Sequence, residues 1–203
     1  MKTKTSLYIS LILILFSNSI LNADTILFDS KNIKIEEDGN IIIANQGTAK
    51  IPTQSILIEG DKSIYNKNVS ELLITGNVKF FDDLNNVYVE SEKAIFNSKT
   101  NKLLAIGITF IQIEDTYDIY SKDILYDRNS MRISSKLETS ILDNLDNIYI
   151  LNDGFLFDTS KETISSKRTT VIDKNRNNYS FDLAKVNLKT REIAGKEVVV
   201  NFK

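Results

Sequence analysis

Two fifteen-residue stretches of the chain align without a gap: KSIYNKNVSELLITG at residues 62–76 and KAIFNSKTNKLLAIG at residues 93–107. Each begins with lysine, carries an aromatic residue and asparagine at its fourth and fifth positions, and ends in an apolar run and glycine. Self-similarity at a period of about 20 to 50 residues is typical of one supersecondary unit stacked on copies of itself. The alignment therefore predicts an elongated repeat protein whose function lies in a long surface.

The aromatic residue and its polar successor form a marker that recurs along most of the chain. The four copies, separated by 31, 30 and 31 residues, are Tyr65-Asn66, Phe96-Asn97, Tyr126-Asp127 and Phe157-Asp158. An apolar-polar-apolar triplet precedes each copy, at residues 56–58, 87–89, 117–119 and 148–150, and more loosely at 179–181. We interpret the marker as the end of a strand that sets the register of each unit.

Apolar and polar residues alternate at period two through most of the chain, and no helical stripe at a period of 3.6 residues is present. Clusters of Asn, Asp and Gly separate the alternating runs, as turns do. The sequence predicts an all-β fold with strands at residues 41–44, 55–59, 62–66, 71–75, 78–81, 87–90, 92–97, 102–106, 109–113, 117–120, 123–126, 148–151, 155–157, 179–184 and 197–202.

The composition excludes several classes of protein. A chain of 203 residues that is 42% hydrophobic and 26% charged fits one domain and is too polar for a bundle of membrane helices. A net charge of −2 gives no basic footprint for nucleic acid. Since the chain has no histidine or cysteine, nucleophiles activated by histidine, zinc-binding imidazoles and disulfides are excluded. We expect no metal, no cofactor and no enzymatic activity.

The first 23 residues have the pattern of a secretory signal peptide. Lys2 and Lys4 precede an apolar run at residues 7–16, and a short polar segment leads to Ala23, the expected cleavage site. The alternative is an uncleaved membrane anchor, if Ile20 and Leu21 extend the apolar run. Residues 24–203 then form one β domain in the bacterial periplasm, where association with the outer membrane is a further expectation.

Parity within the strands groups the apolar residues, because residues two apart share a face of a sheet. If the alternation continues from each triplet through the marker, three apolar side chains per unit lie on one face. The aromatic ring of the marker then lies on the opposite face, which carries most of the polar side chains. The twelve predicted positions are Ile56, Ile58, Ile64, Val87, Val89, Ile95, Tyr117, Ile119, Leu125, Ile148, Ile150 and Leu156. They fit the ordinary core of a β-sandwich as well as a lipid-binding groove.

The repeated motifs resemble the OstA-like family of lipopolysaccharide transport proteins. The resemblance rests on Lys93-Ala94-Ile95-Phe96-Asn97 with residues 101–107, and on residues 64–67 with 72–78, and it covers about residues 41–202. It implies an elongated twisted β-jellyroll in which two antiparallel sheets form a V-shaped groove. Lipopolysaccharide acyl chains would lie in this groove against the twelve positions.

The resemblance also implies partners, and it leaves the subfamily open. Members of the family join other jellyroll proteins of a trans-envelope bridge by pairing edge strands. The chain resembles both the LptA-like bridge proteins and the amino-terminal domain of LptD, which continues into an outer-membrane barrel. An uncleaved amino-terminal segment would instead fit a membrane-anchored LptC-like component.

Two other classes of function are alternatives. One is an exported structural or adhesive β-repeat protein. The other is a polysaccharide-active enzyme on a β scaffold, with paired carboxylates such as Asp143 and Asp146 as acid and base. We interpret these carboxylates as turn residues.

Overall fold

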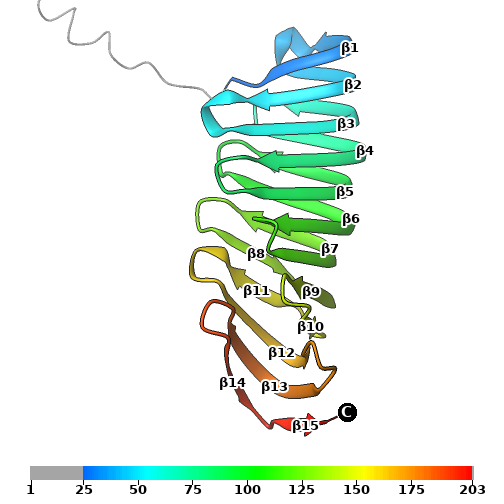
Figure 1. The fold of residues 1–203 in the computed structure, drawn as a ribbon. Helices are drawn as coiled ribbons and strands as arrows, with labels where there is room; N and C mark the ends of the chain where they lie inside the picture. Colours follow the sequence, from blue (N-terminus) through cyan, green and yellow to red (C-terminus); the bar gives the residue numbers. More distant parts are fainter. Residues whose placement is uncertain (1–24, 203) are drawn as a thin grey trace, which may run out of the picture.

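The computed structural model describes residues 25–202 as a twisted stack of antiparallel strands (Figure 1). The elements are β1 (Leu27–Glu36), η1 (Glu37–Gly39), β2 (Ile41–Ile51), η2 (Pro52–Gln54), β3 (Ile56–Asn66), β4 (Glu71–Asp82), β5 (Val87–Asn97), β6 (Lys102–Ile113), β7 (Tyr117–Asp127), β8 (Arg132–Ser135), β9 (Thr139–Asp143), β10 (Ile148–Leu151), β11 (Phe155–Asp158), η3 (Thr159–Lys161), β12 (Thr163–Ile172), β13 (Asn178–Asn187), β14 (Glu192–Lys196) and β15 (Val199–Asn201). The predicted all-β, antiparallel class is confirmed. The predicted signal peptide at residues 1–23 lies outside the described residues.

All fifteen strands belong to one hydrogen-bonded sheet. Strands β1 to β7 pair in sequence order, and then the sheet divides into shorter strands: β7 pairs with both β8 and β9, and β12 pairs with both β11 and β10. β13 lies beside β12 and pairs with β14 and β15. Within residues 25–202, no helix has the length and apolar character needed to span a membrane.

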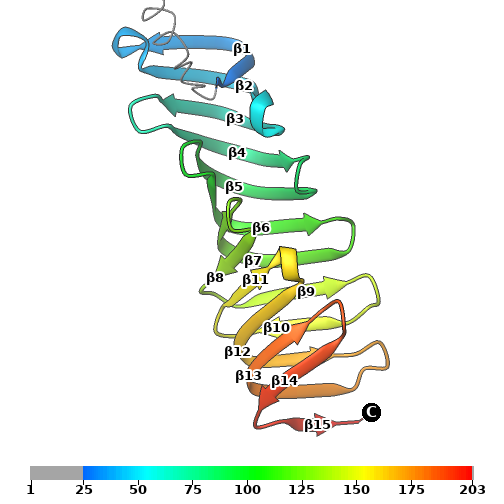
Figure 2. The same cartoon turned by 90° about the vertical axis from the view of Figure 1, so that its left-hand side faces the viewer.

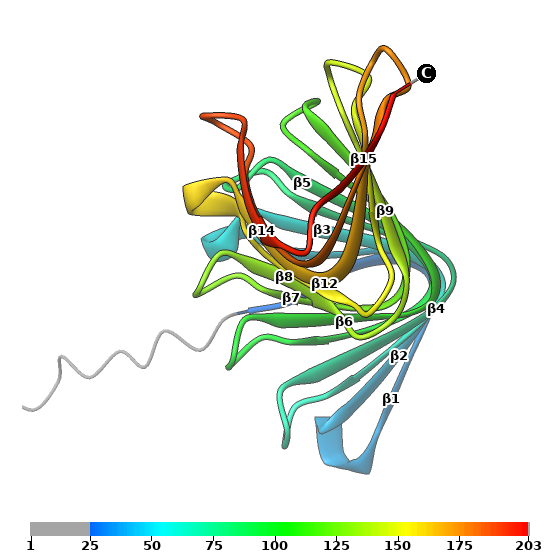
Figure 3. The same ribbon diagram turned by 90° about the horizontal axis from the view of Figure 1, so that it is seen from below.

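The long strands bend near their middle, which gives the sheet two walls joined along one side (Figure 3). The pairing shifts at each bend, for example between Glu59 and Lys62 in β3 and between Ser91 and Lys93 in β5. Such bulges kink a strand and increase its local twist. Wall I contains residues 56–59, 78–82, 87–91, 109–113, 117–121, β9, β10, 169–172 and 178–181. Wall II contains residues 63–66, 71–75, 93–97, 102–105, 124–127, β8, β11, 163–167, 183–187 and β14. The two expected sheets are therefore two walls of one bent sheet.

The inner faces of the two walls pack directly against each other. The rings of Phe80 in wall I and Phe96 in wall II have centroids 5.6 Å apart. Further along the stack, Tyr117 in wall I meets Phe157 in wall II edge to face, also at 5.6 Å. Aromatic pairs in these arrangements add to the stabilisation that burial provides. Between β3 and β11 the interior is thus a filled core.

The polar residue of the marker caps the turn that follows each strand. Its side-chain oxygen accepts a hydrogen bond from a backbone N–H two or three residues later, as in an Asx turn. The donors are Asn68 to Asn66 at 3.0 Å, Thr100 to Asn97 at 2.9 Å, Ser130 to Asp127 at 3.2 Å and Lys161 to Asp158 at 3.2 Å. Because β3, β5, β7 and β11 all end at the marker, its predicted role as a strand end is confirmed.

Five strands were not predicted from the sequence: β1, β8, β9, β12 and β14. β12 illustrates the reason, since Ser166 and Thr169 occupy buried inner positions between Ile164 and Val171. Polar residues at inward positions hide the period-two signal. The sequence also predicts two short strands in places where the structure has one. Residues 55–59 and 62–66, for example, are the two halves of the single bent strand β3.

Gly154, which lies between β10 and β11, provides a test of the backbone geometry. Its φ is +80°, and a Cβ atom would lie 2.4 Å from the Ser135 carbonyl oxygen and 2.7 Å from Lys136 Cα. Since both are backbone atoms, neither can rotate away. We expect Gly154→Ala to lower the free energy of unfolding by about 1–3 kcal/mol, measured by urea denaturation with far-UV circular dichroism.

Gly39→Ala is the matched control, because Gly39 has a φ of +91° and its nearest neighbour, Lys67 Nζ, lies 3.9 Å from the added atom. Both glycines therefore have a positive φ, but only at Gly154 would the added Cβ atom lie close to backbone atoms. A loss at Gly154 no larger than the loss at Gly39 would contradict the expected clash.

Candidate functional site

The structure divides the twelve predicted positions between two faces of the sheet. Six lie on the inner face of wall I and are at most 8% exposed: Ile56, Ile58, Val87, Val89, Tyr117 and Ile119. The other six lie on the outer face, partly or largely exposed: Ile64, Ile95, Leu125, Ile148, Ile150 and Leu156. The expectation that all twelve share one face is therefore wrong.

The bend and the register of one strand pair explain the division. Pairing between β5 and β6 passes from Ser91 opposite Thr109 to Lys93 opposite Ile106, so one unpaired residue reverses the alternation in β5, while two unpaired residues leave it unchanged in β6. Ile148 and Ile150 face outward for a second reason: Ile148 pairs with Leu142, which lies on the outer face, whereas Val87 pairs with the buried Asp82. A register change of one residue moves every following side chain to the other face.

The aromatic rings of the marker lie inside the protein, so their assignment to the wet face is also wrong. Phe96, Tyr126 and Phe157 are fully buried, and Tyr65 is half-buried. The sequence did carry a signal for the bends: Gly76 of β4 and Gly107 of β6, at equivalent repeat positions, adopt φ values of +75° and +87° where the strand pairing shifts. An isolated glycine inside a strand pattern often marks a bulge.

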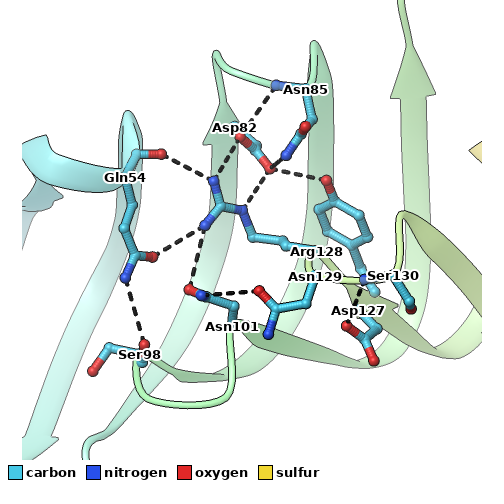
Figure 4. Close-up of polar contacts among 10 residues, drawn as sticks. Gln54, Asp82, Asn85, Ser98, Asn101, Asp127, Arg128, Asn129 and Ser130 are labelled. Atoms are coloured by element: carbon cyan, nitrogen blue, oxygen red, sulfur yellow. Dashed lines mark hydrogen bonds and ion pairs between the residues drawn. The ribbon is translucent and has the colours of Figure 1, made fainter. Parts of the chain in front are cut away.

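A buried ion pair joins the two walls at the mouth, the open edge opposite the bends (Figure 4). Arg128, in the turn after β7, donates from Nε to Asp82 Oδ2 at 2.6 Å and from Nη2 to Asp82 Oδ1 at 3.0 Å. It also donates to the Gln54 backbone oxygen at 2.9 Å and to Gln54 Oε1 at 3.0 Å. The side chains of Arg128 and Asp82 are 6% and 0% exposed. We call this group of Arg128, Asp82 and Gln54 the latch.

The protonation states in the latch follow from its hydrogen bonds. Burial alone would raise the pKa of Asp82, but hydrogen bonds from Arg128, Asn85 and Tyr126 outweigh burial and hold the pKa below its usual value. Burial, together with the neighbouring Asp82 carboxylate, raises the pKa of Tyr126. Near neutral pH, Tyr126 is therefore a phenol that donates to the Asp82 carboxylate, at 2.9 Å.

The lowered pKa of Asp82 predicts an acid-dependent loss of stability. Its contribution is fully present above the ordinary value of 3.8 and is lost as pH falls through the lower folded-state value. We expect the urea midpoint of the wild-type protein to fall between about pH 5 and pH 2, and to fall less steeply in Asp82→Asn. Equal slopes in urea titrations of the two proteins over this pH range would contradict the prediction.

Toward the carboxyl end, a hollow of about 570 Å³ lies between the walls. Its apolar lining comes from Tyr149, Val171 and Tyr179 of wall I and from Val186 and Ile193 of wall II. Tyr179 and Ile193 are only half-buried. Of the ion pairs found among residues 25–202, only the pair of Arg128 with Asp82 joins wall I to wall II. The mouth over this hollow is therefore not closed by an ion pair between the walls.

Two aspartates hold the turns at the rim of the hollow. Asp143 accepts hydrogen bonds from the N–H groups of Leu145 and Asn147, from the Asn147 amide and from the Tyr149 hydroxyl. Asp173 repeats the arrangement with Asn175, Asn177 and Tyr179. Asp143 is thus a turn residue, as predicted. In the described part of the chain, no three metal-binding side chains are grouped so that they could hold an ion.

Comparisons with known proteins add little to these observations. No protein-family model and no curated protein matches the sequence. One solved structure that aligns is LptH from Pseudomonas aeruginosa, described as the LptA homologous periplasmic component of the conserved lipopolysaccharide transport device. The alignment covers 89% of this chain and 96% of LptH, with 8% identity and a TM-score of 0.30.

Proposed function

We propose that this protein takes part in lipopolysaccharide transport across the periplasm and holds lipid acyl chains between its two walls. The observation that carries the proposal is the apolar inner face, which runs through the stack and opens into the hollow near the carboxyl end. The resemblance of the repeated motifs to OstA-like proteins supports the same assignment.

The energetics of acyl-chain burial fit a long apolar interior. Each CH₂ group transferred from water contributes about 0.8 kcal/mol, so a chain of several CH₂ groups is held by contacts along its length. The volume of the hollow falls in the range of about 300–1,000 Å³ that is usual for small-molecule sites. The hollow therefore has room for part of an acyl chain, while the filled core between β3 and β11 would have to open before it took one.

The two ends of the stack support a role in a bridge of several proteins. β1 and β15 lie at opposite ends (Figure 2), and within residues 25–202 each pairs with a single strand. Exposed apolar residues accompany both, among them Ile35 at 64% and Val199 at 56%. Unpaired strand edges are templates for pairing with another chain, so the proposed partners are other β-jellyroll proteins, or an outer-membrane barrel.

Site-specific photocrosslinking in Gram-negative cells tests the lipid-binding role. p-Azidophenylalanine replaces an aromatic residue at inner position Phe96 or Tyr179, or at Tyr120, which is 52% exposed on the outer face. We expect lipopolysaccharide adducts from at least one inner position and none from Tyr120. The absence of adducts from both inner positions would overturn the proposed function and favour a structural β-repeat protein.

A further inference from the structure

We propose that the hollow near the carboxyl end is the ligand chamber of this protein, and that Arg191 at its mouth binds the anionic group of an acylated amphiphile. The inference rests on the proposed function and assigns it to one part of the interior. Three observations carry it: the contacts that close the mouth between Gln54 and Glu162, the lining of the hollow, and the position of Arg191.

The latch closes the mouth upstream of the hollow. Arg128 binds Asp82 through two hydrogen bonds and binds Gln54 through two more, so wall II is fastened to wall I at two successive turns. A second contact across the mouth follows, in which the Tyr117 hydroxyl donates to Glu162 Oε2 at 3.1 Å. A ligand entering the interior beneath these contacts would have to leave a buried carboxylate without its partner, which is costly.

The lining of the hollow fits an acyl chain. Val171 and Val186 are buried at its base, one from each wall, and Tyr149 and Tyr179 form one side. Because both tyrosine hydroxyls donate to turn aspartates, their polar atoms are satisfied at the rim and their rings face the cavity as apolar surface. The site therefore combines an apolar interior with polar groups at its edge, as ligand sites generally do.

Arg191 supplies a positive charge at the mouth. It lies at the end of the turn after β13, in wall II, and lines the hollow opposite the turns of wall I. Burial and the Asp143 carboxylate raise the pKa of Tyr149 in wall I, and the charge of Arg191 partly opposes that rise. Arg191 takes part in none of the ion pairs found among residues 25–202, and the nearby Asp173 is already engaged by its own turn. A guanidinium binds phosphate or carboxylate through paired N–H donors.

Calorimetric titration of the purified protein tests the role of Arg191. The probes are dodecyl phosphate and the uncharged dodecyl maltoside, both below the concentration at which they form micelles. We expect Arg191→Gln to weaken dodecyl phosphate binding by about tenfold or more and to leave dodecyl maltoside binding unchanged. Arg176→Gln, on the adjacent turn of wall I and outside the lining of the hollow, is the matched control and should alter neither affinity. Equal affinity of the wild-type and Arg191→Gln proteins for dodecyl phosphate would overturn the inference.

Photocrosslinking separates the failure of this inference from the failure of the proposed function. We expect lipopolysaccharide adducts from p-azidophenylalanine at Tyr179, in the chamber, and none at Phe96, beneath the latch. Adducts at Phe96 equal to or stronger than those at Tyr179 would overturn the confined chamber and leave the transport role standing. No adducts at either position would overturn both.

Discussion

Replacement of Arg128 by methionine is expected to lower the free energy of unfolding by about 3–5 kcal/mol. The substitution keeps much of the side-chain volume but removes all five hydrogen bonds of the guanidinium, four to Asp82 and Gln54 and one to Asn101. Asp82, with a side chain 0% exposed, is then left as a buried carboxylate with only Asn85 and Tyr126 as donors. A single domain is stable by only about 5–15 kcal/mol, so this loss removes a large part of the total.

The double variant Arg128→Met with Asp82→Leu separates the cost of an unpaired charge from the net contribution of the pair. When both charges of a buried pair are replaced by apolar groups, most of the lost stability is commonly regained. We therefore expect the double variant to unfold at a higher urea concentration than Arg128→Met alone. An equal or lower midpoint would show that the latch stabilises the walls through its geometry and not mainly through charge compensation.

Arg132→Gln is the surface control for the same measurement. Arg132 lies 3.9 Å from Asp158, and its side chain is 49% exposed. Exposed ion pairs contribute about 0–1 kcal/mol, so the urea midpoint of this variant should stay close to that of the wild type. A loss in Arg128→Met as small as the loss in Arg132→Gln would contradict the role assigned to the latch.

The latch also shows why sequence alone could not predict which part of the mouth is closed. Asp82 stands in a cluster of Asp and Asn residues that the sequence identifies as a turn, and Arg128 stands in another. Nothing in the spacing of 46 residues between them indicates contact. They meet because the bend folds the two rows of turns toward each other, and the bends depend on one or two unpaired residues inside each strand.

The repeat was predictable because it depends on local chemistry that each unit carries in full. An aromatic residue followed by Asn or Asp supplies both a buried ring and the oxygen that caps the next turn, so each copy is visible in the sequence. Which side chains of a strand point to the interior was predictable for only one half of the strand. In the first three units alternation is reliable up to the bend, where Ile58 and Val89 are buried as predicted, and it fails just beyond, where Ile64 and Ile95 face outward.

Phe96→Ala is expected to cause a loss of stability of similar size, about 3–5 kcal/mol. Phe96 is fully buried, lies opposite Leu72 and Leu103 on the neighbouring strands, and packs on Phe80 across the interior. Truncation to alanine removes the ring and leaves a cavity that two sheet walls cannot easily collapse to fill. Urea denaturation with far-UV circular dichroism measures the loss.

Ile95→Ala in the adjacent position decides between the two facings of the strand. Uninterrupted alternation would bury Ile95 and expose Phe96, whereas the reversal at the bend does the opposite. We expect Ile95→Ala to cost about 1 kcal/mol or less, because a partly exposed side chain loses little contact on truncation. A larger loss at Ile95 than at Phe96 would contradict the reversal, and it would return Ile64, Ile95, Leu125 and Leu156 to the interior as candidate lipid contacts. The expected order, with Phe96 the more costly, assigns the interior to the marker aromatics and leaves those four aliphatic residues as surface on the outer face of wall II.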